Sequence, residues 1–369
     1  MKILTVIGAR PQFIKAASVS RVFTNTTGVD EVLVHTGQHF DSNMSEIFFG
    51  QLQIPSPTHY LGIHGGAHGE MTGRMLIEIE KILLIERPDG VLVYGDTNST
   101  LASALAAAKL DIPVIHVEAG LRSFNRTMPE EINRILTDHA ASLLLSPTDQ
   151  ATANLQHEGV NPTTIVQVGD VMYDSTLVFR EFMPELAEVG KIQGLSLNEE
   201  YILATVHRQD NTDDPARLEA ILRGLGAVAH QINVVLPLHP RTRQRIVHFG
   251  LTDLLAPLQT CEPLGFLDMM RLQVSCAAIV TDSGGIQKEA FFHRKACVTL
   301  RDETEWVELV ESGWNRISPP LSSNICASVL EALGSEGADV TPYGNGDAAE
   351  RVVLETMRFL SAYANGAKA

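Results

Sequence analysis

Short apolar runs alternate along the chain with longer segments of helical periodicity. In the first half, these runs cover residues 3–7, 32–35, 90–94, 114–117, 143–145 and 165–168. The pattern restarts in the second half at residues 201–206, 234–238, 278–281 and 297–300. Apolar runs without polar alternation are typical of strands that helices bury on both faces. The sequence therefore predicts α/β units built on parallel sheets.

A polar, glycine-containing stretch at residues 183–200 separates the two series of runs. The length of 369 residues also exceeds the roughly 100–200 residues of one ordinary domain. We expect two Rossmann-like, doubly wound domains facing a cleft, over residues 1–170 and 171–346. Residues 347–369 are predicted to form a C-terminal helix that packs back on the N-terminal domain and frays at its end.

Charge and composition narrow the classes of partner. A formal net charge of −16 argues against nucleic acids and anionic membranes, which attract a clustered positive field. The N-terminal apolar run is too short for a signal peptide, and no apolar stretch approaches the roughly 20 residues of a membrane span. The four cysteines lack metal-binding spacing, so we expect free thiols, no metal and a cytoplasmic location.

Polar residues gather directly after the predicted strands, where ligands bind in open parallel sheets. Arg10 and Lys15 follow the first run, without the GxGxxG fingerprint of a dinucleotide-binding dehydrogenase. Asp96, Glu118 and Glu130 follow later runs of the first half. Each carboxylate alone is more often a helix cap or an ion-pair partner. Gathered at one sheet edge with two cations, they favour a functional site, because clustered like charges lower stability.

The second half carries a phosphate-binding pattern, TDSGGIQKE at residues 281–289. Glycines at the start of a helix let backbone N–H groups approach a phosphate, and the helix dipole favours its negative charge. Glu289 lies further along that helix and either accepts hydrogen bonds from ribose hydroxyls or is a solvated carboxylate. His207 and His239 also follow predicted strands. Each is also explained as a capped, solvent-facing side chain.

Six phrases of the chain, in this order, resemble the non-hydrolysing UDP-N-acetylglucosamine 2-epimerase family, whose fold is similar to that of two-domain glycosyltransferase-B enzymes. They are IGARPQFIK at 7–15, YGDTNSTLA at 94–102, HVEAGLRS at 116–123, MPEEINR at 128–134, TVHRQDN at 205–211 and TDSGGIQKEA at 281–290. The resemblance implies elimination of UDP across sugar carbons 1 and 2, then re-addition with the opposite configuration at carbon 2. It implies a UDP-activated 2-acetamido sugar as substrate, no cofactor, and a homodimer.

Matched position by position, the resemblance implies two groups of site residues. The catalytic group comprises Asp96, Glu118, Glu130, His207 and Lys15. The substrate-binding and UDP-binding group comprises Arg10, Arg134, His239, Phe266, Ser283, Gly284, Gly285 and Glu289. Within the second group, the diphosphate is expected at residues 283–285, the ribose at Glu289 and the uracil near Phe266. Which carboxylate removes the proton stays open.

Some phrases depart from the family members that act on UDP-N-acetylglucosamine. Residues 301–306 read RDETEW, where those members usually place an arginine after a Thr-Glu pair. Residues 37–41 and 64–74 do not follow the segments that form an activating second UDP-sugar site in some bacterial members. With residues 169–174, they favour the branch that acts on UDP-2,3-diacetamido-2,3-dideoxyglucuronate for surface polysaccharides. Such a uronate needs a further cation near sugar carbon 6, for which the candidates are Arg122, Arg126 and Arg134.

Two other classes of protein remain open at this point. A glycosyltransferase-B-type UDP-sugar glycosyltransferase would pass the sugar to an acceptor. A non-catalytic nucleotide-sugar sensor would keep the glycine-containing turn without needing the carboxylates. Conversion of a UDP-sugar in the absence of any acceptor separates both from an epimerase.

Overall fold

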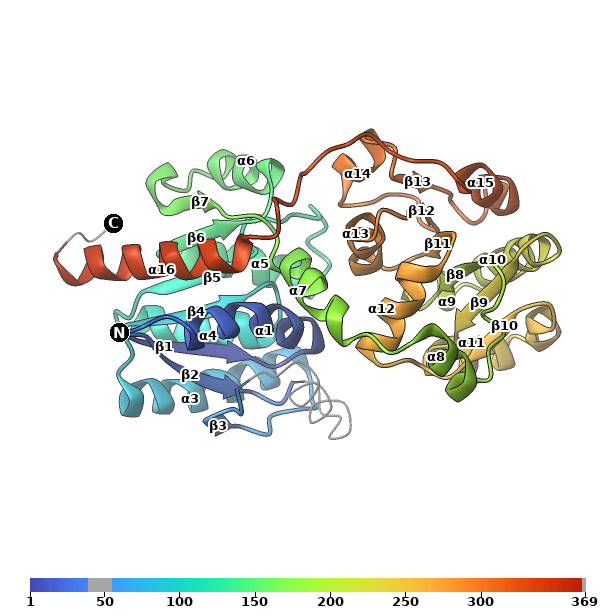
Figure 1. Ribbon diagram of the computed structural model, residues 1–369. Coiled ribbons are helices and arrows are strands. Elements are labelled where there is room, and N and C mark those ends of the chain that lie inside the picture. The colour runs from blue at the N-terminus through green and yellow to red at the C-terminus, as the bar shows by residue number, and fades with distance from the viewer. Residues whose placement is uncertain (39–54, 367–369) are drawn as a thin grey trace. The chain divides into compact units, whose positions relative to one another are not determined.

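The computed structural model describes residues 1–38 and 55–366, which form two α/β units (Figure 1). The first unit comprises Met1–Val178 and Thr341–Ala369, and the second comprises Phe179–Val340. These divisions lie near the predicted boundaries at 170/171 and 346/347. They differ because helix α7 (Val171–Phe179) packs on the first unit, where Ser175 donates a hydrogen bond to the Ile14 carbonyl at 2.8 Å.

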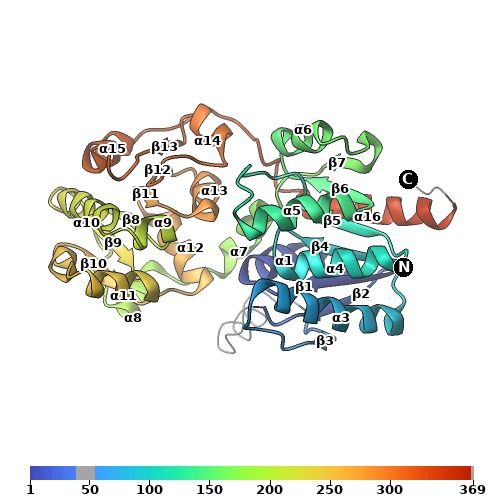
Figure 2. The same cartoon turned by 180° about the vertical axis from the view of Figure 1, so that it is seen from behind.

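The sheet of the first unit has seven parallel strands among the described residues, in the order β3-β2-β1-β4-β5-β6-β7. Its strands are β1 (Lys2–Ile7), β2 (Asp30–His35), β3 (His59–Tyr60), β4 (Gly90–Tyr94), β5 (Val114–Val117), β6 (Leu143–Ser146) and β7 (Ile165–Gln167). Its other helices are α1 (Arg10–Thr24), α3 (His68–Glu86), α4 (Asn98–Lys109), α5 (Pro129–Ala140), α6 (Asp149–His157) and α16 (Ala348–Ala364). Helices α1 and α16 cover one face (Figure 1), and α3, α4 and α5 cover the other (Figure 2).

The sheet of the second unit has six parallel strands, in the order β10-β9-β8-β11-β12-β13. Its strands are β8 (Tyr201–Thr205), β9 (Asn233–Pro237), β10 (Gln259–Cys261), β11 (Ala278–Thr281), β12 (Ala296–Thr299) and β13 (Asn315–Ile317). Its helices are α8 (Leu186–Gln193), α9 (Gln209–Thr212), α10 (Pro215–Ala229), α11 (Pro240–His248), α12 (Phe266–Ser275), α13 (Gly284–Phe292), α14 (Val307–Glu311) and α15 (Ile325–Ala332). One core packs α10, α11 and α15 on the sheet, and the other packs α8, α12 and α13 on its opposite face.

All the apolar runs singled out in the sequence lie on strands, which confirms the predicted α/β class. Burial explains the pattern, since every residue of β4, β5, β8 and β11 is buried. Three short strands were not predicted: β3, β10 and β13, each of two or three residues. Of these three, β10 and β13 contain one buried residue each and β3 contains none, so no apolar run marks these edge strands.

Each sheet contains one point where the strand order reverses. In the first unit, β1 lies between β2 and β4, and in the second, β8 lies between β9 and β11. Loops that leave neighbouring strands there turn to opposite faces, so a crevice opens at the carboxyl ends of the strands. The sites of both units are therefore expected after β1 and β4, and after β8 and β11.

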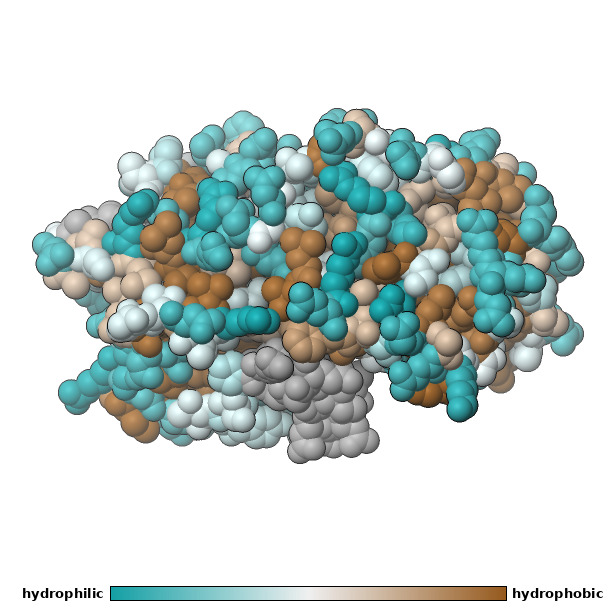
Figure 3. All heavy atoms as spheres, in the orientation of Figure 1, coloured by the Kyte–Doolittle hydropathy of each residue, from teal (hydrophilic) through white to brown (hydrophobic). Residues whose placement is uncertain are grey.

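Within residues 1–38 and 55–366, no helix is long and apolar enough to cross a bilayer. Hydrophilic side chains cover much of the face shown in Figure 3, where apolar areas interrupt them. Charged residues make up 20% of the chain.

Candidate active site

Lys15 and Glu118 form an ion pair at the carboxyl edge of the first sheet. Lys15 lies in the second turn of α1, and Glu118 directly follows β5. The ammonium group of Lys15 contacts Oε2 of Glu118, and the two side chains are only 11% and 10% exposed. Glu118 adopts a left-handed backbone conformation with φ of 69°, uncommon for a residue with a side chain and often found at functional sites. The structure thus brings together two residues that the sequence predicted.

Asp96 and Arg134 form a second ion pair beside the first. Oδ2 of Asp96 lies 2.5 Å from Nη2 of Arg134, and the Asp96 side chain is 31% exposed. The preceding Gly95 has φ of 62°, and a Cβ there would lie 3.1 Å from Glu118 Oε2 and 3.7 Å from Lys15 Nζ. The two ion pairs therefore flank one turn. We call Lys15, Asp96, Glu118 and Arg134 the carboxylate cluster.

Arg10 is the first residue of α1, and the turn before it is fixed by Gln12. Oε1 of Gln12 accepts hydrogen bonds from the N–H groups of Gly8 and Ala9 at 2.8 and 3.0 Å. Its side-chain amide donates to the carbonyl of Tyr94, the last residue of β4, at 2.9 Å. Gln12 thus joins the loops after β1 and β4, a positioning role that the sequence did not reveal.

Glu130 and Glu131 are adjacent but have opposite environments. Glu130 is exposed in the first turn of α5, and no hydrogen bond or ion pair joins it to Asp96 or Glu118 among the described residues. Glu131 is 1% exposed and accepts hydrogen bonds from the N–H groups of Ser123 and Phe124, each at 2.9 Å. Burial alone would raise the pKa of Glu131, but hydrogen bonds from Ser123 and the nearby arginine hold it below its ordinary value.

Glu131 therefore fixes the loop over residues 121–128, and sequence reasoning missed it. The only available signal was the phase of α5, since Glu131 lies seven residues before the buried Asp138 on the same helix face. The predicted Glu130 does not meet the other two carboxylates in this structure.

In the second unit, the buried Asp282 joins the loops after β8 and β11. Its carboxylate accepts hydrogen bonds from the N–H groups of His207 and Arg208 at 3.1 and 3.0 Å, and from Nδ2 of Asn211 at 3.1 Å. Asp282 is fully buried and directly precedes Ser283. The sequence did not identify this residue, although it lies inside the quoted TDSGG phrase.

His207 and His239 lie side by side at the same edge of the second sheet. Their ring centroids are 5.9 Å apart, and the His207 side chain is 41% exposed. His239 caps α11, because its Nδ1 accepts a hydrogen bond from the N–H of Arg241 at 3.3 Å. Burial, and then the charges of His207 and Arg241, lower the pKa of His239. The capping interpretation of His239 is correct, and its ring is still exposed to solvent.

The two glycines after Ser283 have different surroundings. Ser283 caps α13 through its hydroxyl, which accepts a hydrogen bond from the N–H of Ile286 at 3.5 Å. A Cβ on Gly284 would lie 2.2 Å from Oε1 of Glu305, whereas a Cβ on Gly285 would meet nothing closer than 3.9 Å. A side chain at position 284 would therefore require the Glu305 carboxylate to shift. Gly285 is exposed and leaves the helix N-terminus open to a ligand.

Glu289 and Phe266 extend this site along α13 and α12. Oε2 of Glu289 accepts a hydrogen bond from the side-chain amide of Gln273 at 2.6 Å. Phe266 is the first residue of α12, is 8% exposed and packs edge-on against Phe179 with ring centroids 5.9 Å apart. The two predicted residues therefore lie on helices that the Gln273–Glu289 hydrogen bond joins.

The three arginines considered for binding a uronate lie in different environments. The Arg122 side chain is 1% exposed, and its guanidinium lies 2.7 Å from both Asp138 and Glu158. The prediction that Arg122 binds a uronate is therefore wrong, because Asp138 and Glu158 already pair with its guanidinium. Arg134 pairs with Asp96, while Arg126 is exposed in the loop that Glu131 fixes.

Two stretches that depart from the family pattern, at residues 37–41 and 64–74, bear on the predicted loss of an activating site. Residues 39–41 of the departing stretch at 37–41 lie outside the described residues. The stretch at 64–74 includes the start of helix α3 at His68. Nδ1 of His68 lies 3.2 Å from Nδ2 of Asn98. Neither observation tests the prediction about an activating site.

The described residues show no arrangement of three or more His, Cys, Asp or Glu side chains fit to hold a metal ion. All four cysteines are free thiols. Burial raises the pKa of Cys276 and Cys297 to about 12. A thiol that stays protonated is a poor nucleophile, so these two side chains are structural.

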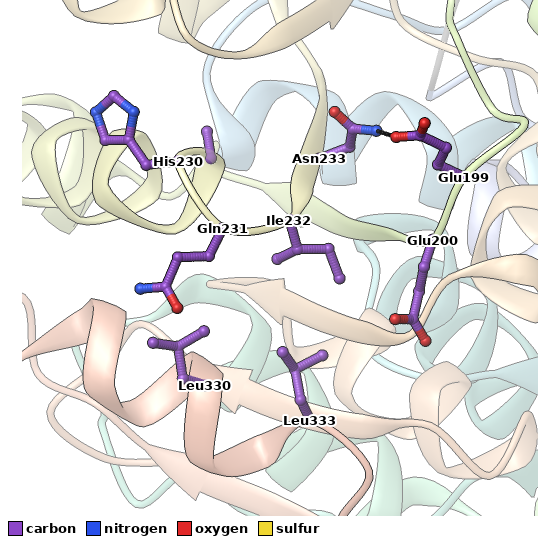
Figure 4. A pocket seen from close by; sticks show the side chains of 9 residues that line it. Glu199, Glu200, His230, Gln231, Ile232, Asn233, Leu330 and Leu333 are labelled. Atoms are coloured by element: carbon purple, nitrogen blue, oxygen red, sulfur yellow. Dashed lines mark hydrogen bonds between the residues drawn. The ribbon is translucent and has the colours of Figure 1, made fainter.

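A pocket in the second unit lies at the opposite edge of the sheet from these residues. Its lining includes Gln231 and Ile232 before β9 and Leu330 and Leu333 around the end of α15, as Figure 4 shows. Asn233, the first residue of β9, donates a hydrogen bond to a glutamate on the rim (Figure 4). Because these loops precede the strands, the pocket is separate from the site after β8 and β11.

The two parallel sheets, with polar residues at their reversal points, define the two-domain architecture of glycosyltransferase-B-like nucleotide-sugar enzymes. The family model described as UDP-N-acetylglucosamine 2-epimerase matches residues 21–356. The chain therefore belongs to the UDP-N-acetylglucosamine 2-epimerase family, whose members are isomerases.

Individual relatives are similar over nearly their whole lengths. UDP-2,3-diacetamido-2,3-dideoxy-D-glucuronate 2-epimerase of Pseudomonas aeruginosa is 53% identical, over 95% of this chain and 98% of its own. The crystal structure of Methanocaldococcus jannaschii UDP-GlcNAc 2-epimerase in complex with UDP-GlcNAc and UDP is 41% identical, with a TM-score of 0.87, over 97% of this chain and 100% of its own. That of the Neisseria meningitidis enzyme bound to UDP-GlcNAc is 29% identical, with a TM-score of 0.87 and the same coverage.

Proposed function

We propose that this protein inverts carbon 2 of a UDP-2-acetamido sugar by eliminating UDP and adding it back. The observation that carries the proposal is that both sheets place their polar residues after the strands at the reversal point. Asp96 and Lys15 follow β4 and β1, while Ser283 and His207 follow β11 and β8. One edge is rich in carboxylates and the other presents a helix N-terminus. We propose that the first edge supplies the proton chemistry and that the second binds the nucleotide.

The carboxylate cluster supplies the proton chemistry in this proposal. One carboxylate removes the proton from carbon 2, the electrons of that bond form the double bond to carbon 1, and UDP leaves with the electrons of the carbon–oxygen bond. Re-addition of UDP to carbon 1 and protonation of carbon 2 on the opposite face complete the epimerisation. Asp96 and Glu118 follow adjacent strands, and the cationic partner of each fixes the position of its carboxylate.

The second unit binds the nucleotide in this proposal. The open N-terminus of α13, at Ser283 and Gly285, attracts the diphosphate through its N–H groups and helix dipole. The N–H of His207 donates to Asp282, directly before this turn, and in this proposal the His207 ring contacts the departing phosphate. Glu289 accepts hydrogen bonds from the ribose hydroxyls in this proposal, and Phe266 lies against the uracil.

We further propose a substrate with a carboxylate at sugar carbon 6, the 2,3-diacetamido-glucuronate form, and Arg126 as the residue that recognises it. Arg122 and Arg134 are committed to carboxylates of the chain. Arg126 is exposed, and its loop is held in place by the buried Glu131. The name of the 53% identical relative supports the same substrate class. Synthesis of surface polysaccharide precursors, a cytoplasmic location and a homodimer remain predictions.

The test incubates the purified protein with each UDP-sugar in deuterated water and without any acceptor. We expect a UDP-linked product with inverted carbon 2, deuterium at that carbon, and faster turnover of the diacetamido uronate than of UDP-N-acetylglucosamine. Transfer that requires an acceptor would instead indicate a glycosyltransferase. Inertness towards both substrates would refute the proposal.

Arg126→Ala tests the substrate class separately. A lost charge-assisted hydrogen bond of about 1.5–3 kcal/mol should lower kcat/KM for the uronate by roughly ten- to a hundredfold. Turnover of UDP-N-acetylglucosamine should not change. Arg223→Ala is the matched control, because Arg223 is exposed on α10 and pairs with Glu219 of the same helix. Equal kcat/KM values for the uronate in Arg126→Ala and the control would remove Arg126 from the site.

A further inference from the structure

His116 lies on β5, two residues before Glu118, and is completely buried. Its Nδ1 lies 2.7 Å from Oδ1 of Asp138, and its Nε2 lies 2.8 Å from the carbonyl oxygen of Gly95. Both distances are those of good hydrogen bonds. The ring therefore bridges α5 and the turn that carries Asp96.

Both partners of the ring accept hydrogen bonds. A backbone carbonyl has no proton to donate, so Nε2 must be the donor to Gly95. Asp138 in turn accepts from Arg122, at 2.7 Å, and from the N–H of Gly120, at 3.2 Å. The ion pair with the buried guanidinium favours the ionised form of Asp138. Asp138 is thus a carboxylate, and Nδ1 must donate to it as well.

We propose that His116 is a buried imidazolium ion that positions Asp96 and Glu118 for the reaction. The proposal rests on the proposed epimerase function. The Gly95 peptide is held on both sides, since its N–H donates to the Val117 carbonyl at 3.0 Å and its carbonyl accepts from His116. Asp96 follows directly, so its backbone cannot rotate freely. His116 touches no reacting atom in this scheme and acts as a positioning residue through the Gly95 turn.

Protonation is tested by nitrogen-15 NMR of protein labelled in its histidine rings, with Asp138→Asn and His116→Gln to assign the signal. We expect two protonated ring nitrogens on His116 at pH 8, where ordinary histidines are neutral. Asp138→Asn should remove that imidazolium signal. A neutral His116 ring with one bare nitrogen at pH 8 would overturn the proposal. Neutron diffraction of the unaltered protein gives the same answer if His116→Gln does not fold.

Positioning is tested by kinetics on His116→Gln, whose amide keeps a hydrogen-bond donor but no charge. We expect kcat to fall by up to about a hundredfold, as misplaced catalytic groups do, while KM and UDP affinity stay close to those of the unaltered protein. His139→Gln, one residue from Asp138 and on the surface, is the control and should match the unaltered protein. A folded His116→Gln protein with full kcat would show that the ring is only structural. Failure of the proposed function would appear differently, as inertness of the unaltered protein.

Discussion

Gln273 on α12 donates a hydrogen bond to one oxygen of Glu289 on α13, over 2.6 Å. Gln273 is 2% exposed, so this amide is fixed inside the second unit and orients the carboxylate next to it.

If Glu289 binds the ribose, Glu289→Ala should weaken UDP binding by about 1–3 kcal/mol. Gln273→Leu should weaken it by less, about 0.5–1.5 kcal/mol, since only the orientation is lost. Calorimetric titration with UDP measures both, with Glu262→Ala, a surface change, as control; an unchanged dissociation constant in Glu289→Ala would assign Glu289 to the solvated surface.

Asp96→Asn and Glu118→Gln should each lower turnover by about 10²–10⁴-fold, because each removes a group that can accept or return a proton. UDP affinity should be preserved, since the nucleotide binds to the second unit in our proposal. Steady-state kinetics together with UDP titration separates the two effects. Loss of UDP binding in parallel with turnover would contradict the proton-transfer role.

Glu130→Gln tests the third predicted carboxylate by the same assay. In the structure, Glu130 is exposed and is not joined to the cluster by any hydrogen bond or ion pair that the described residues form. Turnover should therefore fall as far as in Asp96→Asn only if the bound substrate reaches the first turn of α5. Turnover equal to that of the unaltered protein would remove Glu130 from the chemistry.

Gly284→Ala and Gly285→Ala should separate packing from ligand approach. A methyl group on Gly284 would collide with the Glu305 carboxylate, which Arg301 holds at 2.6 Å. Because only the end of one side chain must shift, the change should destabilise the second unit by about 1 kcal/mol, the low end of the range for overpacking. Gly285→Ala should leave stability unchanged and weaken UDP binding. Denaturant unfolding and UDP titration of both variants check this, and normal UDP affinity in Gly285→Ala would argue against a phosphate at this helix end.

The buried His293 should make the second unit less stable in acid. Burial, and then the charges of Arg180 and Lys295, lower the pKa of His293 to about 3. As pH falls below about 6.5, the unfolded chain takes up a proton that the folded protein refuses, so stability present above that pH is progressively lost. Between pH 7 and pH 5, His293→Leu should lose about 2 kcal/mol less stability than the unaltered protein.

Urea unfolding at several pH values measures the difference between the two proteins. His230→Gln serves as the control, because His230 is exposed. Parallel pH curves for His293→Leu and the unaltered protein would show that His293 does not titrate differently on unfolding.

The sequence was sufficient to predict the features that depend on neighbours along the chain. Strands such as β4 and β5 are recognisable because both faces are buried, which leaves an uninterrupted apolar run. Residues after these strands, such as Asp96 and Glu118, could be assigned to one edge because parallel strands end together. The ion pair of Glu118 with Lys15 follows from that edge, although 103 positions separate the two residues.

Residues that act through contacts across the fold could not be predicted in this way. Asp282 and Gln12 are buried polar side chains whose partners come from other loops, so nothing in their local sequence distinguishes them. Glu130 and Glu131 look alike in sequence and differ only in which side of α5 they occupy. The sequence explained Gly284 by the approach of a phosphate. In the structure, the Glu305 carboxylate also lies close to this position.

The second unit is an insertion within the first. The chain leaves the first unit after Val178 and re-enters it at Thr341, where the N–H of Asp170 donates to the Tyr343 carbonyl at 3.0 Å and the N–H of Ala349 donates to Asp174 at 2.7 Å. During synthesis, the inserted unit is therefore complete before its host has received helix α16. The host reaches its final fold only when the last segment has emerged from the ribosome, so a chain that stops before residue 341 has a finished second unit and an unfinished first.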